Sequence, residues 1–542
     1  MEKEISDIFK LIESKNYIQA YKQSKPLYKK FSHHIEVVKI HFYILSLLER
    51  NIEAIEEINE YSKDNEIKDI NDHEVLNLFG YFFMKTEHYE KSIELLNMAI
   101  SIKNNFGPAH QNLAEVLIVT RDFLKALDHI DKAIDIFSSL NKNVDGFFHC
   151  FILKVDINNA LNRNHETVVM LQNYLSQEFN ENIFYLLSTI DPKEINNETV
   201  DLAEHKLTDN IYYESKVITF SKTVPLQFGL AYYFQKKDKK KSEQYFHKAN
   251  KNVHNILRYN LNTSQKSINS SINFYKEFFM NQSFYETEIG KNNIFIVGLP
   301  RTGTTLTESI ITANDEIFPA GELLSMQDLF ATLAEKSINE KRAYVDHVSK
   351  SYLSRTYYLK NNYEKVVDKL PGNNHLIGFI LKILPGSKII RLYRDPWDTA
   401  ISLYKQRYVK NIPWSTNFFS IGIIMSNYEA INSYWDSVLR GDENILTIKY
   451  EELVRDQKNN QKKLYDFLQI KSSYNEEKRD SFFSKTASTQ QVKEKIHTKS
   501  VKKLEFEDKK DEFWSAVYQQ RKYWTKQGLP IIENGPLFGY EP

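Results

Sequence analysis

The sequence predicts two structural classes in one chain, an all-α solenoid followed by a parallel β-sheet flanked by helices. Two observations predict this α plus α/β fold. Small and apolar residues recur every 34 residues in the first half. After about residue 285, strand-like runs alternate with helix-like runs. We therefore expect a helical repeat domain over residues 1–270 and an α/β domain over residues 285–542.

The helical half is predicted from two well-matched copies of one pattern. Adding 34 to each position of the first copy gives a similar residue in the second: Gly80, Phe83, Ser92, Leu96 and Ala99 correspond to Ala114, Leu117, Ala126, Ile130 and Ala133. This period resembles that of tetratricopeptide (TPR) repeats, and a late copy lies near 228–250. A generic helical bundle is the alternative, and 145–215 is helical without a clear repeat. A TPR solenoid can bind a peptide or partner protein, or self-associate; the sequence leaves this open.

Composition narrows the class of protein. The 71 Lys and Arg residues balance 71 Asp and Glu, so charge gives no support for nucleic acid or an anionic membrane as a partner. Cys150 is the single cysteine of the 542 residues, so no disulfide can form within the chain. No apolar run reaches the ~18 residues of a membrane span. We therefore expect a cytoplasmic protein. The apolar residues 418–425 are too few for a membrane span, and we expect them to form part of a buried helix.

A glycine-containing turn follows the first predicted strand. The segment 298–305 reads GLPRTGTT, and its two glycines let backbone N–H groups face an anion at a helix N-terminus. A nucleoside triphosphatase loop would have Lys at the position of Thr304, whereas the cation here is Arg301. We expect a P-loop-type sheet whose loop binds phosphate through Arg301, Thr302, Gly303, Thr304 and Thr305. A turn without a ligand is the alternative.

Further candidate residues follow the other predicted strands, at 365–368, 388–393 and 444–450. Ligands of parallel sheets bind at the carboxyl ends of strands. Arg394 ends one strand and Ser402 lies on the helix after it, so the two can hold a second phosphate. Lys369 and Tyr450 end the other two strands. A surface ion pair, an exposed lysine and a packed tyrosine are the alternatives.

Taken in order, these segments resemble the sulfotransferases that use 3′-phosphoadenylyl sulfate (PAPS). PRTGTT at 300–305 resembles their 5′-phosphosulfate loop, the Arg394 to Ser402 spacing their 3′-phosphate motif, and DKLPGN at 368–373 their DKxPxN segment. RDPWDTAIS at 394–402 is close to the pattern of a TPR-bearing bacterial branch. The resemblance covers residues 285–505 and implies a bacterial TPR–sulfotransferase fusion whose catalytic domain is similar to tyrosylprotein sulfotransferases.

The resemblance implies transfer of the sulfuryl group to an acceptor hydroxyl by in-line displacement, with 3′-phosphoadenosine 5′-phosphate (PAP) leaving and no metal required. Glu322 corresponds to the general base of this branch. Its alternatives are a carboxylate that opens a helix, or His375 as the base. Lys369 and Ser488 would stabilise the transferring group and the leaving phosphate, with Arg301 behind them.

The resemblance also implies the remaining nucleotide contacts. Tyr450 would hold the adenine, and a closing loop would cover the phosphates through Gln491, Lys493 and Lys502. Lys493 stands where the branch has Arg, which leaves the detail of this loop open. The acceptor is open too: a protein tyrosine, a glycan, a lipid or a small alcohol. A P-loop nucleotide kinase and a TPR scaffold with an inactive nucleotide-binding domain are the alternative functions.

Overall fold

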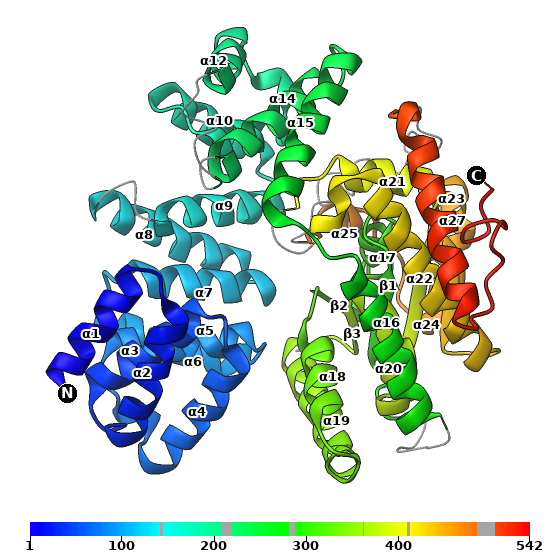
Figure 1. The fold of residues 1–542 in the computed structure, drawn as a ribbon. Helices are drawn as coiled ribbons and strands as arrows, with labels where there is room; N and C mark the ends of the chain where they lie inside the picture. The colour runs from blue at the N-terminus through cyan, green and yellow to red at the C-terminus, as the bar shows by residue number, and fades with distance from the viewer. Residues whose placement is uncertain are drawn as a thin grey trace. The chain divides into compact units, whose positions relative to one another are not determined.

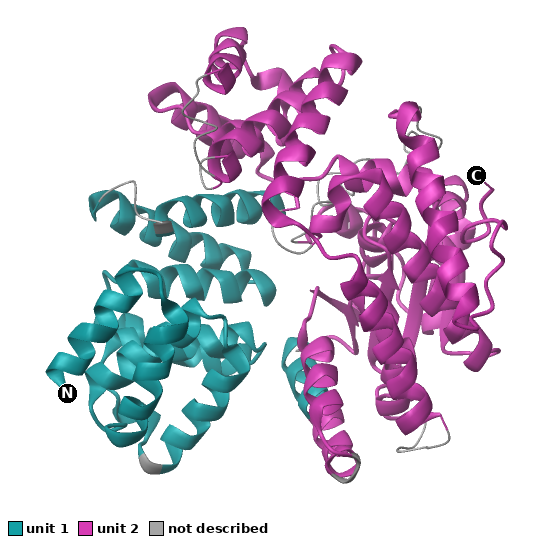
Figure 2. Cartoon of the chain, in the orientation of Figure 1, with its two compact units in different colours: residues 1–161, 351–361 teal, residues 162–350, 362–542 magenta. Residues whose placement is uncertain are grey.

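The computed structural model describes residues 1–140, 145–208, 216, 219–280, 288–360, 362–408, 412–484 and 505–541. Two compact units are distinguished by packing (Figure 2). Unit 1 comprises residues 1–161 and 351–361, and unit 2 comprises residues 162–350 and 362–542. The two domains predicted above, residues 1–270 and 285–542, were distinguished by their sequence patterns and not by packing. The boundary between them therefore stays a prediction.

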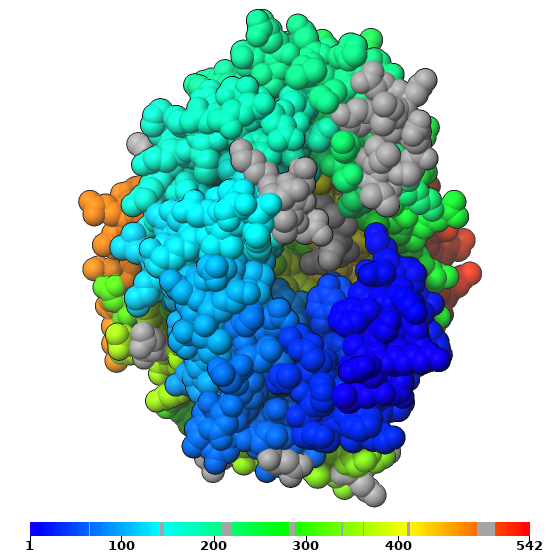
Figure 3. Space-filling view, turned by 90° about the vertical axis from the view of Figure 1, so that its left-hand side faces the viewer, coloured from blue at the N-terminus to red at the C-terminus, as the bar shows by residue number. Residues whose placement is uncertain are grey.

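Residues 1–161 fold as antiparallel helical hairpins (Figure 1). The helices are α1 Glu2–Glu13, α2 Tyr17–Lys30, α3 Ile35–Leu47, α4 Asn51–Asp64, α5 His73–Lys85, α6 Tyr89–Ile102, α7 Gly107–Val119, α8 Phe123–Leu140 and α9 Asp145–Ala160. On the face shown in Figure 3, the surface changes from dark blue to cyan across these helices. The hairpins therefore succeed one another in chain order, as in a solenoid.

The 34-residue period predicted from the sequence recurs in the backbone. One residue between the two helices of a hairpin has a positive φ: 57° at Lys15, 54° at Glu49, 64° at Glu87 and 65° at Arg121. Lys15 and Glu49 are 34 residues apart, and so are Glu87 and Arg121. A residue in the left-handed region ends a helix and turns the chain. The spacing between Glu49 and Glu87 is 87 − 49 = 38 residues, so the period is lengthened once. The same turn is thus made in each of these hairpins, which confirms the predicted helical repeat.

Small residues at the repeat positions let the two helices of a hairpin approach closely. The Ser92 hydroxyl of α6 donates to the Gly80 carbonyl of α5 at 2.7 Å. A Cβ atom on Gly80 would lie 2.7 Å from the Leu96 side chain, closer than side chains pack. The late copy makes the same kind of bond, from the Ser242 hydroxyl to the Ala231 carbonyl at 2.7 Å.

Removing the Ser92 hydroxyl is expected to destabilise the repeat. Ser92→Ala leaves a buried carbonyl without its side-chain donor and should lower the free energy of unfolding by about 1 kcal/mol. Ser101→Ala is the matched control, because the Ser101 hydroxyl lies on the same helix but is exposed. Urea unfolding of the full chain measures both. Equal midpoints for the two variants would contradict the role of Ser92.

In the described residues, unit 2 begins with further α-helices, which lead to a sheet (Figure 1). The helices are α10 Asn164–Gln177, α11 Glu181–Ile190, α12 Asn197–Thr208, α14 Val224–Phe234, α15 Lys239–Leu257 and α16 Asn262–Phe274. The strands are β1 Asn293–Gly298, β2 Ile317–Gly321, β3 Lys365–Asp368, β4 Lys388–Tyr393 and β5 Ile445–Lys449. All neighbours in the order β2-β3-β1-β4-β5 are parallel, which confirms the predicted sheet.

Strand β2 was not among the expected strands. It is short and contains Pro319, which cannot donate a ladder hydrogen bond and is tolerated at sheet edges. Its register with β3 also shifts between Pro319 and Gly321. β2 is the edge strand beside β3. The sheet therefore has one strand more than the apolar runs of the sequence indicate.

The helices that follow the strands complete the α/β layers. They are α17 Thr304–Ile311, α18 Ser325–Glu335, α19 Ile338–Lys360, α20 Ile377–Ile383, α21 Pro396–Tyr404, α22 Phe418–Val438, α23 Tyr450–Arg455, α24 Gln457–Leu468, α25 Glu476–Asp480 and α27 Lys510–Lys526. One apolar cluster joins the strands to α17, α23 and α24. The predicted buried helix at 418–425 is the first part of α22. Within the described ranges, no helix is both long and apolar enough to cross a membrane.

The late repeat packs directly on the α/β part of unit 2. Phe228 of α14 and Phe246 of α15 share an apolar cluster with Trp397 of α21 and with residues of α22 and α27. The Tyr232 hydroxyl donates to the Lys405 carbonyl at 2.8 Å, just beyond α21. The Asn250 amide donates to the Tyr404 carbonyl at 2.8 Å. The hairpin α14–α15 therefore supports the helix that carries Ser402.

Candidate active site

The candidate phosphate loop turns sharply between β1 and α17. Arg301 (φ 72°) and Gly303 (φ 96°) both lie in the left-handed region, and residues of this kind turn backbone N–H groups inward. A Cβ atom on Gly303 would lie 2.6 Å from the Tyr450 ring, so this position requires glycine. The Thr302 hydroxyl donates to the Leu299 carbonyl at 2.7 Å and fixes the turn from within.

Two buried guanidinium groups meet at this loop. The side chains belong to Arg301 and Arg394, which are 8% and 5% exposed. Arg394 Nη1 donates to the Arg301 carbonyl at 2.9 Å, and Arg301 Nε donates to the Ser402 hydroxyl of α21 at 2.9 Å. Burial lowers the pKa of Arg394, yet a guanidinium stays charged at neutral pH. Arg301 and Arg394 also repel one another, and an anion bound beside them offsets that repulsion, so the pair favours an anionic ligand.

The structure brings the other predicted loop residues to the same place. Thr304 and Thr305 are buried in the first turn of α17. The Tyr450 ring packs against Gly303, and the Arg394 guanidinium carbon lies 4.5 Å from its ring centroid. Tyr450 thus holds an arginine of the site in place through a cation–π contact. Contact between Tyr450 and adenine stays a prediction.

A second polar cluster lies where β2 and β3 end. Lys369 follows β3 and its side chain is 1% exposed. Its Nζ lies 2.7 Å from Glu322 Oε1 and 4.0 Å from Glu308 Oε2. The Glu322 side chain is 43% exposed, whereas that of Glu308 is 0% exposed. A buried ammonium therefore lies between a carboxylate that a substrate can reach and one that solvent cannot.

Glu322 does not open a helix. β2 ends at Gly321, whose φ is 72°, and α18 begins only at Ser325. The Lys369 backbone N–H donates to the Gly321 carbonyl at 2.8 Å, which fixes the turn before Glu322. The alternative in which Glu322 opens a helix is therefore wrong, and its carboxylate lies outside the first helical turn.

Glu308 was missed by sequence reasoning. It lies on α17 between apolar positions that pack on the sheet, and Ser484 Oγ donates to Glu308 Oε2 at 3.3 Å. An acidic residue on an apolar helix face was the available signal, because an ionised group is buried only with partners. The predicted residues of the closing loop, Ser488, Gln491, Lys493 and Lys502, lie outside the described residues.

His375, the rival base, is half-buried in the turn Pro371–Leu376. Burial lowers its pKa to about 4, so the imidazole is neutral at pH 7. Lys369 donates its side-chain hydrogen bond to Glu322 rather than to His375. The geometry thus pairs the buried lysine with the carboxylate.

The predicted residues lie at the carboxyl ends of all five strands, in the spatial order of the sheet. Glu322 follows β2, Lys369 follows β3, the loop with Arg301 follows β1, Arg394 follows β4 and Tyr450 follows β5. Neighbouring strands are about 4.8 Å apart. Residues that are far apart in the sequence therefore share one edge of the sheet.

Comparison with known proteins gives relatives that are similar to part of this chain. Cytosolic sulfotransferase 14 of Arabidopsis thaliana is 30% identical over 108 residues, which are 18% of this chain and 30% of that protein. An uncharacterized protein of Aquifex aeolicus is 26% identical over 336 residues, 56% of this chain. The chain spans 43% of the length of the Aquifex protein, so it covers less than half of either relative.

Among solved structures, the sulfotransferase domain from the curacin biosynthetic pathway is 18% identical, with a TM-score of 0.28 over 42% of this chain and 96% of that chain. Residues 293–474 match the sequence model of the sulfotransferase family. The matched range includes the phosphate loop, Arg394, Ser402, Lys369 and Glu322. The similarity of this chain to the sulfotransferase family therefore lies over residues 293–474.

Proposed function

We propose that this protein is a PAPS-dependent sulfotransferase that transfers a sulfuryl group to an acceptor hydroxyl. The observation that supports this most is the edge of the sheet just described. The buried Arg301 and Arg394 converge at the phosphate loop, and the Lys369–Glu322 pair ends the neighbouring strands on one side. The residues proposed to bind phosphate and the residues proposed to transfer the proton therefore lie next to one another at one edge of the sheet.

The donor set fits the two phosphates of PAPS. The loop N–H groups and Arg301 would hold the 5′-phosphosulfate at the start of α17. Arg394 and the Ser402 hydroxyl would hold the 3′-phosphate through charge-assisted hydrogen bonds. When bound, PAPS supplies the sulfuryl group, and PAP leaves as the bond between sulfur and the bridging oxygen breaks.

The acid–base half supplies the proton chemistry. Glu322 would accept the proton of the acceptor hydroxyl as the oxygen bonds to sulfur, and its partly exposed carboxylate is open to an acceptor. Lys369 would place its ammonium beside the developing negative charge. Glu308, 4.0 Å from Lys369 Nζ on the far side from solvent, would keep that ammonium in position.

Two other functions share parts of this site, a nucleotide kinase and a nucleotide-binding scaffold without activity. A kinase loop would have Lys where Thr304 stands, which favours the transferase. Stabilisation of the protein by Mg·ATP but not by PAP in a thermal-shift experiment would favour the kinase. Incubation with labelled PAPS and a cell extract separates the transferase from the scaffold and identifies the acceptor.

We also propose a cytoplasmic location, which suits the single buried Cys150.

Loss of either buried arginine is expected to weaken nucleotide binding. Arg301→Ala and Arg394→Ala each remove charge-assisted bonds of about 1.5–3 kcal/mol, so the Kd for PAP should rise roughly 10- to 150-fold. Isothermal titration calorimetry of the full chain in EDTA measures the Kd, and EDTA itself should change nothing. Arg440→Ala, at an exposed arginine elsewhere in unit 2, is the control. Wild-type affinity for PAP in both the Arg301→Ala and the Arg394→Ala variant would refute the proposed site.

A further inference from the structure

Residues 535–540, the C-terminal turn, fold back onto the end of strand β4. Leu537 and Tyr540 close this turn by exchanging two backbone hydrogen bonds, of 2.9 and 3.0 Å. The C-terminal turn contacts the residues next to Arg394, which is proposed above to hold the 3′-phosphate. We propose that it positions Arg394 and thereby sets the preference of the site for a nucleotide with a 3′-phosphate, provided that the site binds PAPS as proposed above.

The backbone is strained at the tip of the C-terminal turn. Phe538 has a φ of 54° and Gly539 a φ of 78°, both in the left-handed region. Glycine adopts this conformation readily, whereas a bulky residue does so only where its surroundings hold it there. The Phe538 ring stacks on Tyr393, the last residue of β4, with ring centroids 4.9 Å apart, and Leu537 is fully buried. Strain of this kind is concentrated at functional sites.

The C-terminal turn is anchored to the core of unit 2. Arg521 of α27 is 0% exposed and donates to the Gly535 carbonyl at 2.5 Å and to the Pro536 carbonyl at 2.8 Å. The same guanidinium donates to both carboxylate oxygens of Glu429 on α22, at 2.6 and 2.7 Å. A guanidinium paired in this two-point manner has a fixed orientation. The C-terminal turn is therefore held in one position relative to α22 and α27.

Phe538 lies directly beside the phosphate loop. Together with Arg394 and the loop residues Gly298 and Thr302, it lines a cavity of about 10 Å³. A cavity of this size holds at most one water molecule. Phe538 is therefore close to Arg394 and limits where the guanidinium can lie.

A second contact acts on Arg394 through Glu451. The Tyr540 hydroxyl donates to Glu451 Oε2, and Glu451 Oε1 accepts the backbone N–H of Asp395 at 3.0 Å. Asp395 follows Arg394 and caps α21, because its carboxylate accepts the Asp398 N–H at 2.8 Å. Burial and the bond to Glu451 raise the pKa of Tyr540, so the hydroxyl remains a donor at neutral pH. Tyr540 therefore helps to fix the backbone from which the Arg394 side chain extends.

The test compares PAP with AMP, which lacks the 3′-phosphate, by isothermal titration calorimetry of the full chain. Tyr540→Phe removes the hydroxyl that donates to Glu451 and keeps the ring. We expect the Kd for PAP to rise about three- to ten-fold, as for loss of one hydrogen bond, and the Kd for AMP to change by less than about two-fold. A merely structural defect would weaken both nucleotides alike, so the ratio of the two Kd values is the informative quantity.

Further variants localise the effect. In a Glu451→Ala background, Tyr540→Phe should have no additional effect on the ratio, because both changes interrupt the same chain of hydrogen bonds. Phe538→Asn tests the direct contact: asparagine tolerates the left-handed conformation but lacks the ring, and it should also weaken PAP more than AMP. Thermal melts confirm that the variants fold.

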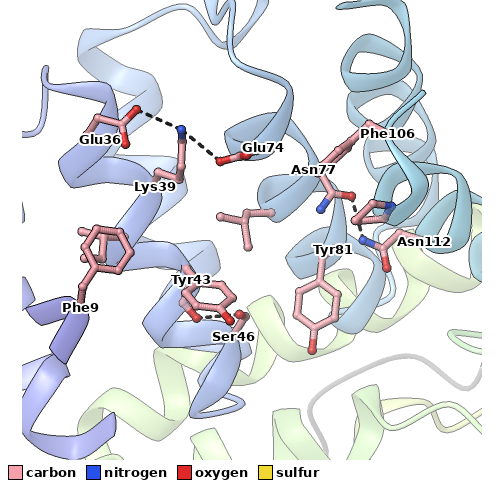
Figure 4. Close-up of a pocket in the computed structure, with 13 residues that line it drawn as sticks. Phe9, Glu36, Lys39, Tyr43, Ser46, Glu74, Asn77, Tyr81, Phe106 and Asn112 are labelled. Carbon is pink, nitrogen blue, oxygen red and sulfur yellow. Dashed lines mark hydrogen bonds and ion pairs between the residues drawn. The ribbon is translucent and has the colours of Figure 1, made fainter. Parts of the chain in front are cut away.

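Two tyrosines serve as controls and should leave the ratio unchanged. The Tyr245 hydroxyl also donates to a carboxylate, that of Glu204 at 2.7 Å, so Tyr245→Phe is the matched variant. Tyr43→Phe changes a tyrosine of unit 1, in a pocket of about 590 Å³ lined by residues of α1, α3, α5 and α7 (Figure 4).

Three outcomes would overturn the proposal. These are an unchanged ratio in both Tyr540→Phe and Phe538→Asn, an equal loss of affinity for PAP and AMP, and an effect of Tyr540→Phe that persists in the Glu451→Ala background. In each of them a wild-type preference for PAP over AMP would leave the proposed sulfotransferase site intact. A wild type that binds PAP no better than AMP would instead contradict the proposed function as well.

Discussion

Replacing Glu322 by Gln is expected to lower kcat by about 100-fold or more, which is the usual contribution of a general base. Glutamine keeps the shape and one hydrogen-bond acceptor of the side chain but cannot accept a proton. The Kd for PAP should change little, because the carboxylate lies at the end of β2 and the phosphate loop follows β1, two strands away in the sheet. Steady-state kinetics with the labelled acceptor, beside calorimetry with PAP, measure the two quantities.

The acceptor must have an unactivated hydroxyl, because an acidic phenol loses its proton without help and would hide the defect. Glu335→Gln, at the exposed end of α18, is the control. Unchanged turnover of Glu322→Gln would exclude Glu322 as the base. His375→Gln would then be the decisive variant, and a loss of turnover there would assign the base to the imidazole.

Replacing Lys369 by Met is expected to lower kcat/KM by about 100- to 1,000-fold, the range for loss of one preorganised donor to a developing negative charge. Methionine fills nearly the same space, so the loss would come from the ammonium. The variant should also be less stable, because Glu308 stays buried after the neighbouring cation is removed. Kinetics and urea unfolding measure these two effects separately.

The double variant Lys369→Met with Glu308→Gln separates catalysis from stability. Removal of the buried carboxylate should restore most of the lost stability and none of the lost activity. Recovery of activity together with stability would mean that Lys369 has a structural role only. Glu308→Gln alone should shift the position of the ammonium and lower kcat less than Lys369→Met does.

The sequence predicted most of this fold because its signals are periodic. Small residues 34 apart indicated the helical hairpins, and short strand-like runs indicated β1, β3, β4 and β5. β2 gave no such signal because Pro319 interrupts a five-residue strand at the sheet edge. Proline lacks the backbone N–H that a strand between two neighbours needs, so an edge strand tolerates it.

The candidate site was predicted less completely than the fold, because residues that contact one another in the site lie far apart in the sequence. Lys369, Arg394 and Tyr450 could each be found from their own strands, whereas Glu322 was found from the resemblance, because β2 was not predicted. The contact between Lys369 and Glu322 joins positions 47 residues apart. Only the sheet order brings them together. Glu308 contacts the same lysine from α17, where one acidic residue in an apolar helix has no periodic signature.

The contact between α14–α15 and α21 limits which helical repeats this protein can gain or lose. Solenoids gain and lose whole repeats with little cost, because each repeat touches only its neighbours. The last hairpin here also contacts the helix of Ser402, so its removal would uncover Trp397 and other core side chains. Insertion or deletion of repeats is therefore costly at this hairpin, and also in unit 1, where residues 351–361 belong to the same compact unit as the first repeats. A truncated enzyme designed to retain nucleotide binding should begin before α14 rather than at β1.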